Sequence, residues 1–109
     1  MKDLVWCGDS LECVKAFSEK ARREAGYELS SVQMGEDPSD WKPMNTIGQG
    51  VKEIRIKDGQ GAFRIIYIAK LEEAIYVLHA FQKKSQKTRQ ADLELAQQRL
   101  SLLRSRKNE

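Results

Sequence analysis

The sequence predicts an α+β fold in which one or two helices are followed by an antiparallel meander and a C-terminal helix. Three consecutive segments between residues 51 and 81 have strand-like patterns and are separated by turn residues, whereas the flanking segments have helical spacing. The chain has 109 residues, which is enough for one hydrophobic core and too few for two. We therefore expect a single domain over residues 1–109.

The chain is expected to begin with a short strand at Leu4–Cys7. Cys7 and Cys13 are the only cysteines, and five residues separate them. This spacing, without a neighbouring histidine, does not match a zinc site, and one pair of cysteines is too few for a disulfide scaffold. We expect two reduced, partly buried thiols and no bound metal or cofactor.

Two helices are expected next. Asp9 or Ser10 can cap a helix that runs to about Ala25, because an Asx or Ser side-chain oxygen accepts hydrogen bonds from the free amides of the first turn. Gly26 is expected to end this helix. Residues 27–34 are then expected to form a second, shorter helix.

The stretch Gly35–Gly50 is expected to be a connecting loop. It contains both prolines of the chain, three glycines and three acidic residues, and such residues favour turns over regular structure. Trp41 and Met44 are expected to hold this loop against the core.

Three strands are expected in the second half of the chain. Val51–Lys57 alternates between isoleucines on one face and charged residues on the other. Asp58–Gly61 is a hairpin signal, because glycine supplies the positive φ that tight turns need. Ala62–Ala69 forms the next strand, Leu71–Glu73 the next turn, and Ala74–Phe81 a strand that is apolar on both faces and therefore central.

A final helix is expected at about Arg89–Arg104, with Thr88 as its cap. One apolar stripe at helical spacing is expected to face the sheet, and it consists of Leu93, Ala96, Leu100 and Leu103.

Charge is unevenly distributed along the chain. Residues 1–50 contain 6 Lys and Arg against 9 Asp and Glu, whereas residues 51–109 contain 13 against 7. This asymmetry indicates one basic surface, which suits a phosphate-rich partner. No apolar run approaches the roughly 18 residues of a membrane span, and the N-terminus lacks a long apolar signal core. We expect a cytoplasmic protein without membrane association.

Arg64 is the strongest single candidate for a functional residue. It stands among apolar residues in Phe-Arg-Ile-Ile-Tyr, where a charge without a partner is costly to bury. Its planar fork can bind two phosphate oxygens and stabilise developing negative charge. The alternative is an ion pair with Glu53 across the hairpin, and the sequence leaves both open. Arg55, on the outward face of the preceding strand, is placed to join Arg64.

His79 is the only histidine and lies in an otherwise apolar strand. One interpretation is a core residue whose hydrogen bonds are satisfied. The other is a general acid or base acting on a ribose hydroxyl, because histidine titrates near neutrality. A metal site is not expected, because no second histidine or cysteine cluster is available.

Lysines follow the last expected strand and form a positive patch at Lys83, Lys84 and Lys87. Together with Arg64 and a proton-transfer group, they suit metal-independent RNA cleavage. In that reaction a 2′-hydroxyl attacks the adjacent phosphorus and cations stabilise the pentavalent transition state. Residue types and spacing alone leave this as one function among several.

Four segments together resemble the phage-derived branch of the RelE/HigB toxin family. They are Trp41–Ile56, Phe63–Tyr67, His79–Thr88 and Asp92–Arg99. The resemblance extends over roughly residues 4 to 103. It implies a small RelE-like α+β domain, in which a twisted antiparallel sheet packs against N-terminal helices and a C-terminal helix.

The resemblance also implies roles for individual residues. Arg64 matches the family's phosphate and transition-state arginine, Arg55 a basic strand residue, and Lys83 the basic residue after the last strand. Glu53 and His79 are the candidates for proton transfer. Residues expected to contact RNA are Lys52, Lys57, Lys84, Lys87 and Arg89.

The activity that the resemblance implies is that of a toxin in a type II toxin–antitoxin pair. Such a toxin is a ribosome-dependent, metal-independent endoribonuclease that cleaves messenger RNA in the A site. Its partners would be the ribosome, the messenger RNA and a helix-turn-helix antitoxin, with which it can form a heterotetramer. Two alternatives stay open: a gyrase inhibitor like the ParE relatives, and a non-catalytic module that binds antitoxin or RNA on the same scaffold.

Overall fold

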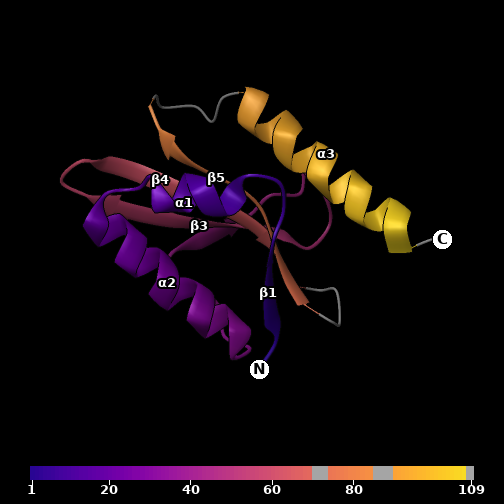
Figure 1. Cartoon of the computed structure of the whole chain (residues 1–109), viewed down its shortest axis with the longest axis horizontal. Coiled ribbons are helices and arrows are strands. Elements are labelled where there is room, and N and C mark those ends of the chain that lie inside the picture. The colour runs from indigo at the N-terminus through magenta and orange to yellow at the C-terminus, as the bar shows by residue number, and fades with distance from the viewer. Residues whose placement is uncertain (70–73, 85–89, 108–109) are drawn as a thin grey trace.

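The computed structural model describes residues 1–69, 74–84 and 90–107, and it contains one five-stranded sheet (Figure 1). The strands are β1 (Asp3–Trp6), β2 (Trp41–Pro43), β3 (Val51–Asp58), β4 (Gly61–Ile68) and β5 (Ala74–Lys83). The helices are α1 (Ser10–Lys15), α2 (Glu19–Gln33) and α3 (Gln90–Lys107). The predicted α+β fold is thus confirmed, with helices before the meander and one helix after it.

The sheet is mixed and has the strand order β1-β5-β4-β3-β2. The pairs β3–β4 and β4–β5 are antiparallel, as predicted. β2 is also antiparallel to β3, whereas β1 lies parallel to β5 at the edge. The two N-terminal helices carry the chain from β1 to the far edge of the sheet. The meander then returns, so that β5 arrives beside β1 in the same direction.

The break between the first two helices differs from the prediction. It falls at Ala16–Ser18, and α2 then continues through Gly26 to Gln33. The Ser18 hydroxyl accepts a hydrogen bond from the Ala21 amide at 3.2 Å and caps α2. An interior glycine costs a helix only about 1 kcal/mol, and the buried stripe of α2 on both sides of Gly26 compensates for this cost. That stripe consists of Ala21, Ala25, Leu29 and Val32.

The predicted loop between residues 35 and 50 contains the short strand β2, which the sequence did not indicate. β2 pairs with β3, so that Lys42 lies opposite Glu53, and its proline is tolerated because this is the edge of the sheet. Met44 is buried as predicted, and Trp41 is half-buried. The loop passes beneath α3, where a Cβ at Gly48 would lie 2.5 Å from the Leu100 side chain.

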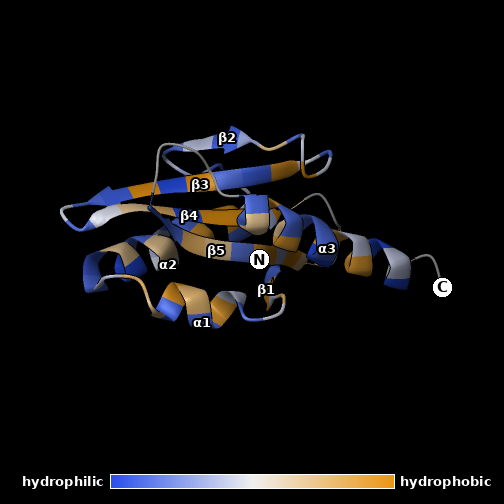
Figure 2. Cartoon of the chain, turned by 90° about the horizontal axis from the view of Figure 1, so that it is seen from above, coloured by the Kyte–Doolittle hydropathy of each residue, from blue (hydrophilic) through white to orange (hydrophobic). Residues whose placement is uncertain are grey.

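Two hydrophobic clusters lie on opposite faces of the sheet. Figure 1 shows α2 and α3 on opposite sides of the strands, and in Figure 2 β2 at the sheet edge is largely hydrophilic. The cluster under α1 and α2 includes Val14, Phe17, Leu29, Ile54, Ile56, Phe63, Ile65, Tyr67, Ile75 and Val77. The cluster under α3 includes Met44, Ile47, Val51, Ile66, Ile68, Leu78, Ala96, Leu100 and Leu103. The predicted stripe of α3 is therefore confirmed.

An irregularity in β5 decides which residues face α3. In the register with β4, Ile66 pairs with His79 and Tyr67 pairs with Val77. Leu78 is therefore an extra residue in β5. A bulge of this kind changes the alternation of side chains along the strand. It places His79 on the same face as Ile66, which packs under α3.

The predicted hairpin at Asp58–Gly61 is confirmed, and Gly61 has a φ of +139°. The predictions for the turn Leu71–Glu73, the cap Thr88 and the start of the last helix at Arg89 lie outside the described residues. Within the described ranges, no helix is both long and apolar enough to cross a membrane.

Candidate functional site

Basic residues occupy one end of the sheet face that also carries α3. Arg55 lies directly opposite Arg64 in the β3–β4 register, and Ala62 has Lys57 on one side and Lys83 on the other. Paired residues on neighbouring strands project from the same face. Four basic side chains from three strands therefore share a face: Arg55, Lys57, Arg64 and Lys83.

Arg64 is buried, with 3% of its surface exposed. Its Nη1 donates a hydrogen bond to the Phe63 carbonyl at 3.0 Å, and its Nε lies 3.7 Å from Glu53 Oε1. Burial lowers the pKa of Arg64, the Glu53 carboxylate opposes this change, and Arg55 adds to it. The ion pair that the sequence left as an alternative is present, but its atoms are farther apart than in a hydrogen bond.

Glu53 is the buried carboxylate of this cluster and has 0% exposure. Lys42 Nζ lies 3.9 Å from Glu53 Oε1, on the side away from Arg64. Among the described residues, neither oxygen of Glu53 has a hydrogen-bond partner. A buried charge is stable only beside opposite charge, so Glu53 and the two cations hold one another in place.

Arg55 and Lys83 complete the cluster. The Nε of Arg55 is buried and makes no hydrogen bond to any described residue. Partial burial, followed by the charge of Arg64, lowers the pKa of Lys83. Like charges directly opposite each other destabilise a sheet, and a bound anion would remove that cost. The arrangement can therefore hold a phosphate group and stabilise negative charge that develops on it.

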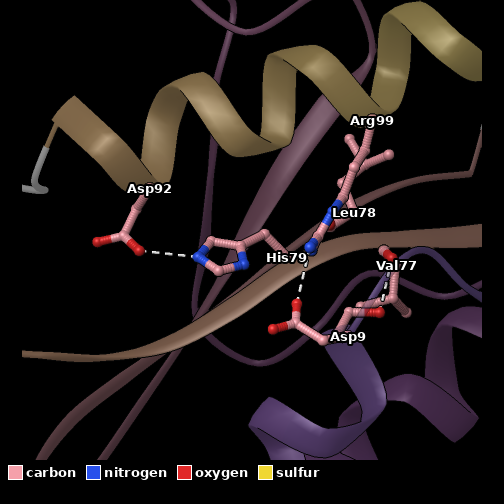
Figure 3. Close-up of polar contacts among 7 residues, drawn as sticks. Asp9, Val77, Leu78, His79, Asp92 and Arg99 are labelled. Atoms are coloured by element: carbon pink, nitrogen blue, oxygen red, sulfur yellow. Dashed lines mark hydrogen bonds and ion pairs between the residues drawn. The ribbon is translucent and has the colours of Figure 1, made fainter.

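His79 lies at the border between the basic end and the part of the face under α3. It is 5% exposed, and its Nε2 is 2.8 Å from Asp92 Oδ1 on α3 (Figure 3). Its ring stacks on Phe81 with centroids 5.5 Å apart. These contacts fit the core interpretation of His79. Asp92 was not among the predicted functional residues, although it lies one turn before Ala96 on the stripe that faces the sheet.

The residues predicted to contact RNA are divided by the fold. Lys57 is exposed on the face of Arg64, and Lys84 is exposed just after β5. Lys52 is not with them, because strand alternation directs it to the opposite face. There its Nζ lies 2.7 Å from Asp37 and 4.4 Å from the Trp41 ring centroid. Lys87 and Arg89 lie outside the described residues.

Arg99, which was not predicted as a functional residue either, joins three elements beside His79. Its guanidinium donates to the Leu78 carbonyl at 3.0 Å and to Asp9 Oδ1 at 2.7 Å (Figure 3). Gly8, with a φ of +53°, lies beneath it, and a Cβ there would be 2.6 Å from the guanidinium. Arg99 thereby links α3 to β5 and to the start of α1.

Comparison with known protein families identifies relatives of this chain. The model of the family described as Phage derived protein Gp49-like (DUF891) matches residues 12–101. This range contains β2 to β5, most of α3 and the whole basic end of the sheet. A search of curated proteins finds no match.

Proposed function

Because the chain belongs to the phage-derived Gp49-like family, a family of toxin–antitoxin toxins of the RelE superfamily type, we propose that it is an endoribonuclease toxin. Its substrate is messenger RNA in the ribosomal A site, and its action is therefore cytoplasmic. Membership of the family implies an antitoxin partner. We assign that role to a helix-turn-helix protein that forms a heterotetramer with the toxin.

The observation that carries the proposal is the pair of arginines facing each other across β3 and β4 beside Lys83. Cations fixed on a sheet stabilise a pentavalent phosphorane without having to reorganise during the reaction, and such electrostatic stabilisation usually contributes most to the rate enhancement of an enzyme. Arg64 and Arg55 bind the non-bridging oxygens. Exposed Lys57 and Lys84 guide the RNA backbone to them.

The proposed reaction is an in-line attack of a ribose 2′-oxygen on the adjacent phosphorus. The 2′-hydroxyl proton passes to solvent water, the bond to the 5′-oxygen of the next nucleotide breaks, and a 2′,3′-cyclic phosphate remains. Lys83 protonates that leaving oxygen, because its lowered pKa makes its proton easier to donate. Glu53 is fully buried, so we assign it the positioning of Arg64. His79 already binds Asp92 through Nε2, which supports a structural role over proton transfer.

The burial of Arg64 also favours a second candidate. A guanidinium that is 3% exposed and paired with Glu53 can serve the fold alone. On this alternative the chain is a non-catalytic module that binds antitoxin, or a gyrase inhibitor like the ParE relatives.

The test is to induce the chain in bacteria from a tightly repressed promoter and to map messenger RNA 5′ ends within minutes. The proposal expects new ends in translated frames. It also expects Lys83→Gln to suppress them and Lys15→Gln, at an exposed position of α1, to leave them unchanged. Growth arrest without new ends, or gyrase-linked DNA breaks, would overturn the proposal in favour of the alternatives.

A further inference from the structure

A second cluster of reactive side chains lies where β5 extends past the end of β1. The last pair between these strands joins Trp6 and Val77, so β5 has no β1 partner at His79. The start of α1 and the side of α3 approach each other there, as the contacts of Arg99 with Asp9 and Leu78 show (Figure 3).

Three potential metal ligands meet at this place. A carboxylate oxygen of Asp9, the sulfur of Cys13 and a ring nitrogen of His79 all lie within 4.8 Å of one another. Asp9 and Cys13 are four residues apart at the start of α1, a spacing that places side chains on one face of a helix. We propose that Asp9, Cys13 and His79 form a binding site for a divalent transition-metal ion of the Zn²⁺ type.

The hydrogen bonding of His79 is the independent observation that points to a ligand. Its Nε2 faces Asp92 Oδ1 at 2.8 Å, and an ionised carboxylate only accepts hydrogen bonds. Nε2 therefore carries the proton, and in the neutral ring Nδ1 has a free lone pair. That Nδ1 is buried and has no hydrogen-bond partner among the described residues. In Figure 3 it lies on the side of the ring toward Asp9.

Metal sites commonly contain a carboxylate hydrogen-bonded to a histidine, as Asp92 is to His79. A metal-binding histidine usually donates its other N–H to a carboxylate, which fixes the tautomer and the orientation of the ring. Here that carboxylate comes from α3 and the remaining ligands come from α1. Asp92 is thus a positioning residue for the proposed site.

The donor set selects the class of metal. One thiolate, one imidazole nitrogen and one carboxylate oxygen suit Zn²⁺, whereas Mg²⁺ and Ca²⁺ prefer oxygen ligands alone. Asp9 is exposed and Cys13 half-buried, so an ion has a path to the site, and water can supply a fourth ligand. A small closure is needed, because ligands around tetrahedral zinc lie roughly 3.3–3.8 Å apart given its bond lengths.

Arg99 limits the affinity of the site. Its guanidinium binds Asp9 Oδ1 at 2.7 Å, which places a positive charge beside the proposed ligands. Repulsion between this charge and a dication weakens binding. Removal of the charge by Arg99→Gln is therefore expected to tighten metal binding, provided that the variant remains folded.

The experiment is a titration of the purified full-length chain with Co²⁺ as a spectroscopic probe and with Zn²⁺ by calorimetry. A thiolate ligand is expected to give a sulfur-to-cobalt charge-transfer band in the near ultraviolet, which Zn²⁺ then removes. Cys13→Ser is expected to abolish this band, whereas Cys7→Ser, the matched change at the other free cysteine, keeps it. Asp92→Asn is expected to weaken Zn²⁺ binding about 10–100-fold.

Two results would overturn the proposal. One is the absence of the charge-transfer band in the unaltered chain, and the other is a band that Cys7→Ser removes and Cys13→Ser keeps. Circular dichroism of each variant shows whether it is folded. If Cys13→Ser does not fold, Asp9→Asn at the exposed ligand replaces it, and undiminished Zn²⁺ affinity in that variant would also count against the site.

Discussion

The two ends of the sheet face that carries α3 differ in what their side chains do. At one end Val51, Ile66 and Ile68 pack with Leu100 and its neighbours on α3. At the other end Arg55 lies opposite Arg64, and the buried Glu53 carries the compensating charge. The first arrangement stabilises the fold through apolar burial. The second places like charges side by side, which lowers stability unless the site binds an anion.

The strongest test of the apolar end is Leu100→Ala. Leu100 is 2% exposed and belongs to the cluster under α3, so the change should lower the free energy of unfolding by about 2–5 kcal/mol. Denaturant titration measures this loss. Leu102→Ala, at a position that is 56% exposed, is the control and should change stability by less than about 0.5 kcal/mol. Equal losses in the two variants would show that α3 does not pack as described.

The basic end is tested by Arg64→Lys. Lysine keeps a positive charge beside Glu53, and so protects the fold, but it cannot bind two phosphate oxygens with a planar fork. RNA cleavage should fall about 100-fold, with little change in melting temperature. Arg23→Lys, at an exposed position of α2, should leave the cleavage rate unchanged. Full activity of Arg64→Lys would mean that Arg64 serves only the ion pair with Glu53.

The substitution His79→Gln tests whether the histidine at the border between the two ends is structural or transfers a proton. The loss of the hydrogen bond to Asp92 and of the stacking on Phe81 should lower the free energy of unfolding by about 1–3 kcal/mol. Cleavage by the protein that remains folded should persist. Thermal unfolding and cleavage assays on the same preparation separate the two effects. Native stability with lost cleavage would instead assign proton transfer to His79.

The smallest change in stability is expected from loss of the contact between Arg99 on α3 and Asp9 at the start of α1. The hydrogen bond from Arg99 lowers the pKa of Asp9 in the folded state. The resulting stability is therefore fully present above the ordinary carboxyl pKa of about 3.9, and it is lost as the pH falls through the lowered value.

Because Asp9 is exposed, this contribution should not exceed about 1 kcal/mol. Comparison of wild type with Asp9→Asn by denaturant titration at a series of pH values measures it. The stability difference should shrink as the medium becomes acidic. A difference that stays constant down to about pH 2, well below the ordinary carboxyl pKa, would exclude the Arg99 contact as its source.

Local patterns were sufficient for most of the fold. Alternation identified β3 and β4, glycine chemistry the hairpin between them, and helical spacing the stripe of α3. They failed where tertiary packing outweighs local preference. Gly26 remains inside α2 because its neighbours are buried, and β2 forms within a proline-containing loop because β3 offers a free edge.

Arg55 and Arg64 were predictable as strand residues among apolar neighbours, because a period of two residues is a local property of the chain. Lys83 was predicted to follow the last strand, whereas β5 extends to include it. Which residues lie beside them depends on the tertiary structure. Register placed Arg55 opposite Arg64, strand alternation sent Lys52 to the other face, and the extra residue Leu78 turned His79 toward Asp92. Register and bulges depend on contacts between segments far apart in the chain, and no window of sequence contains those contacts.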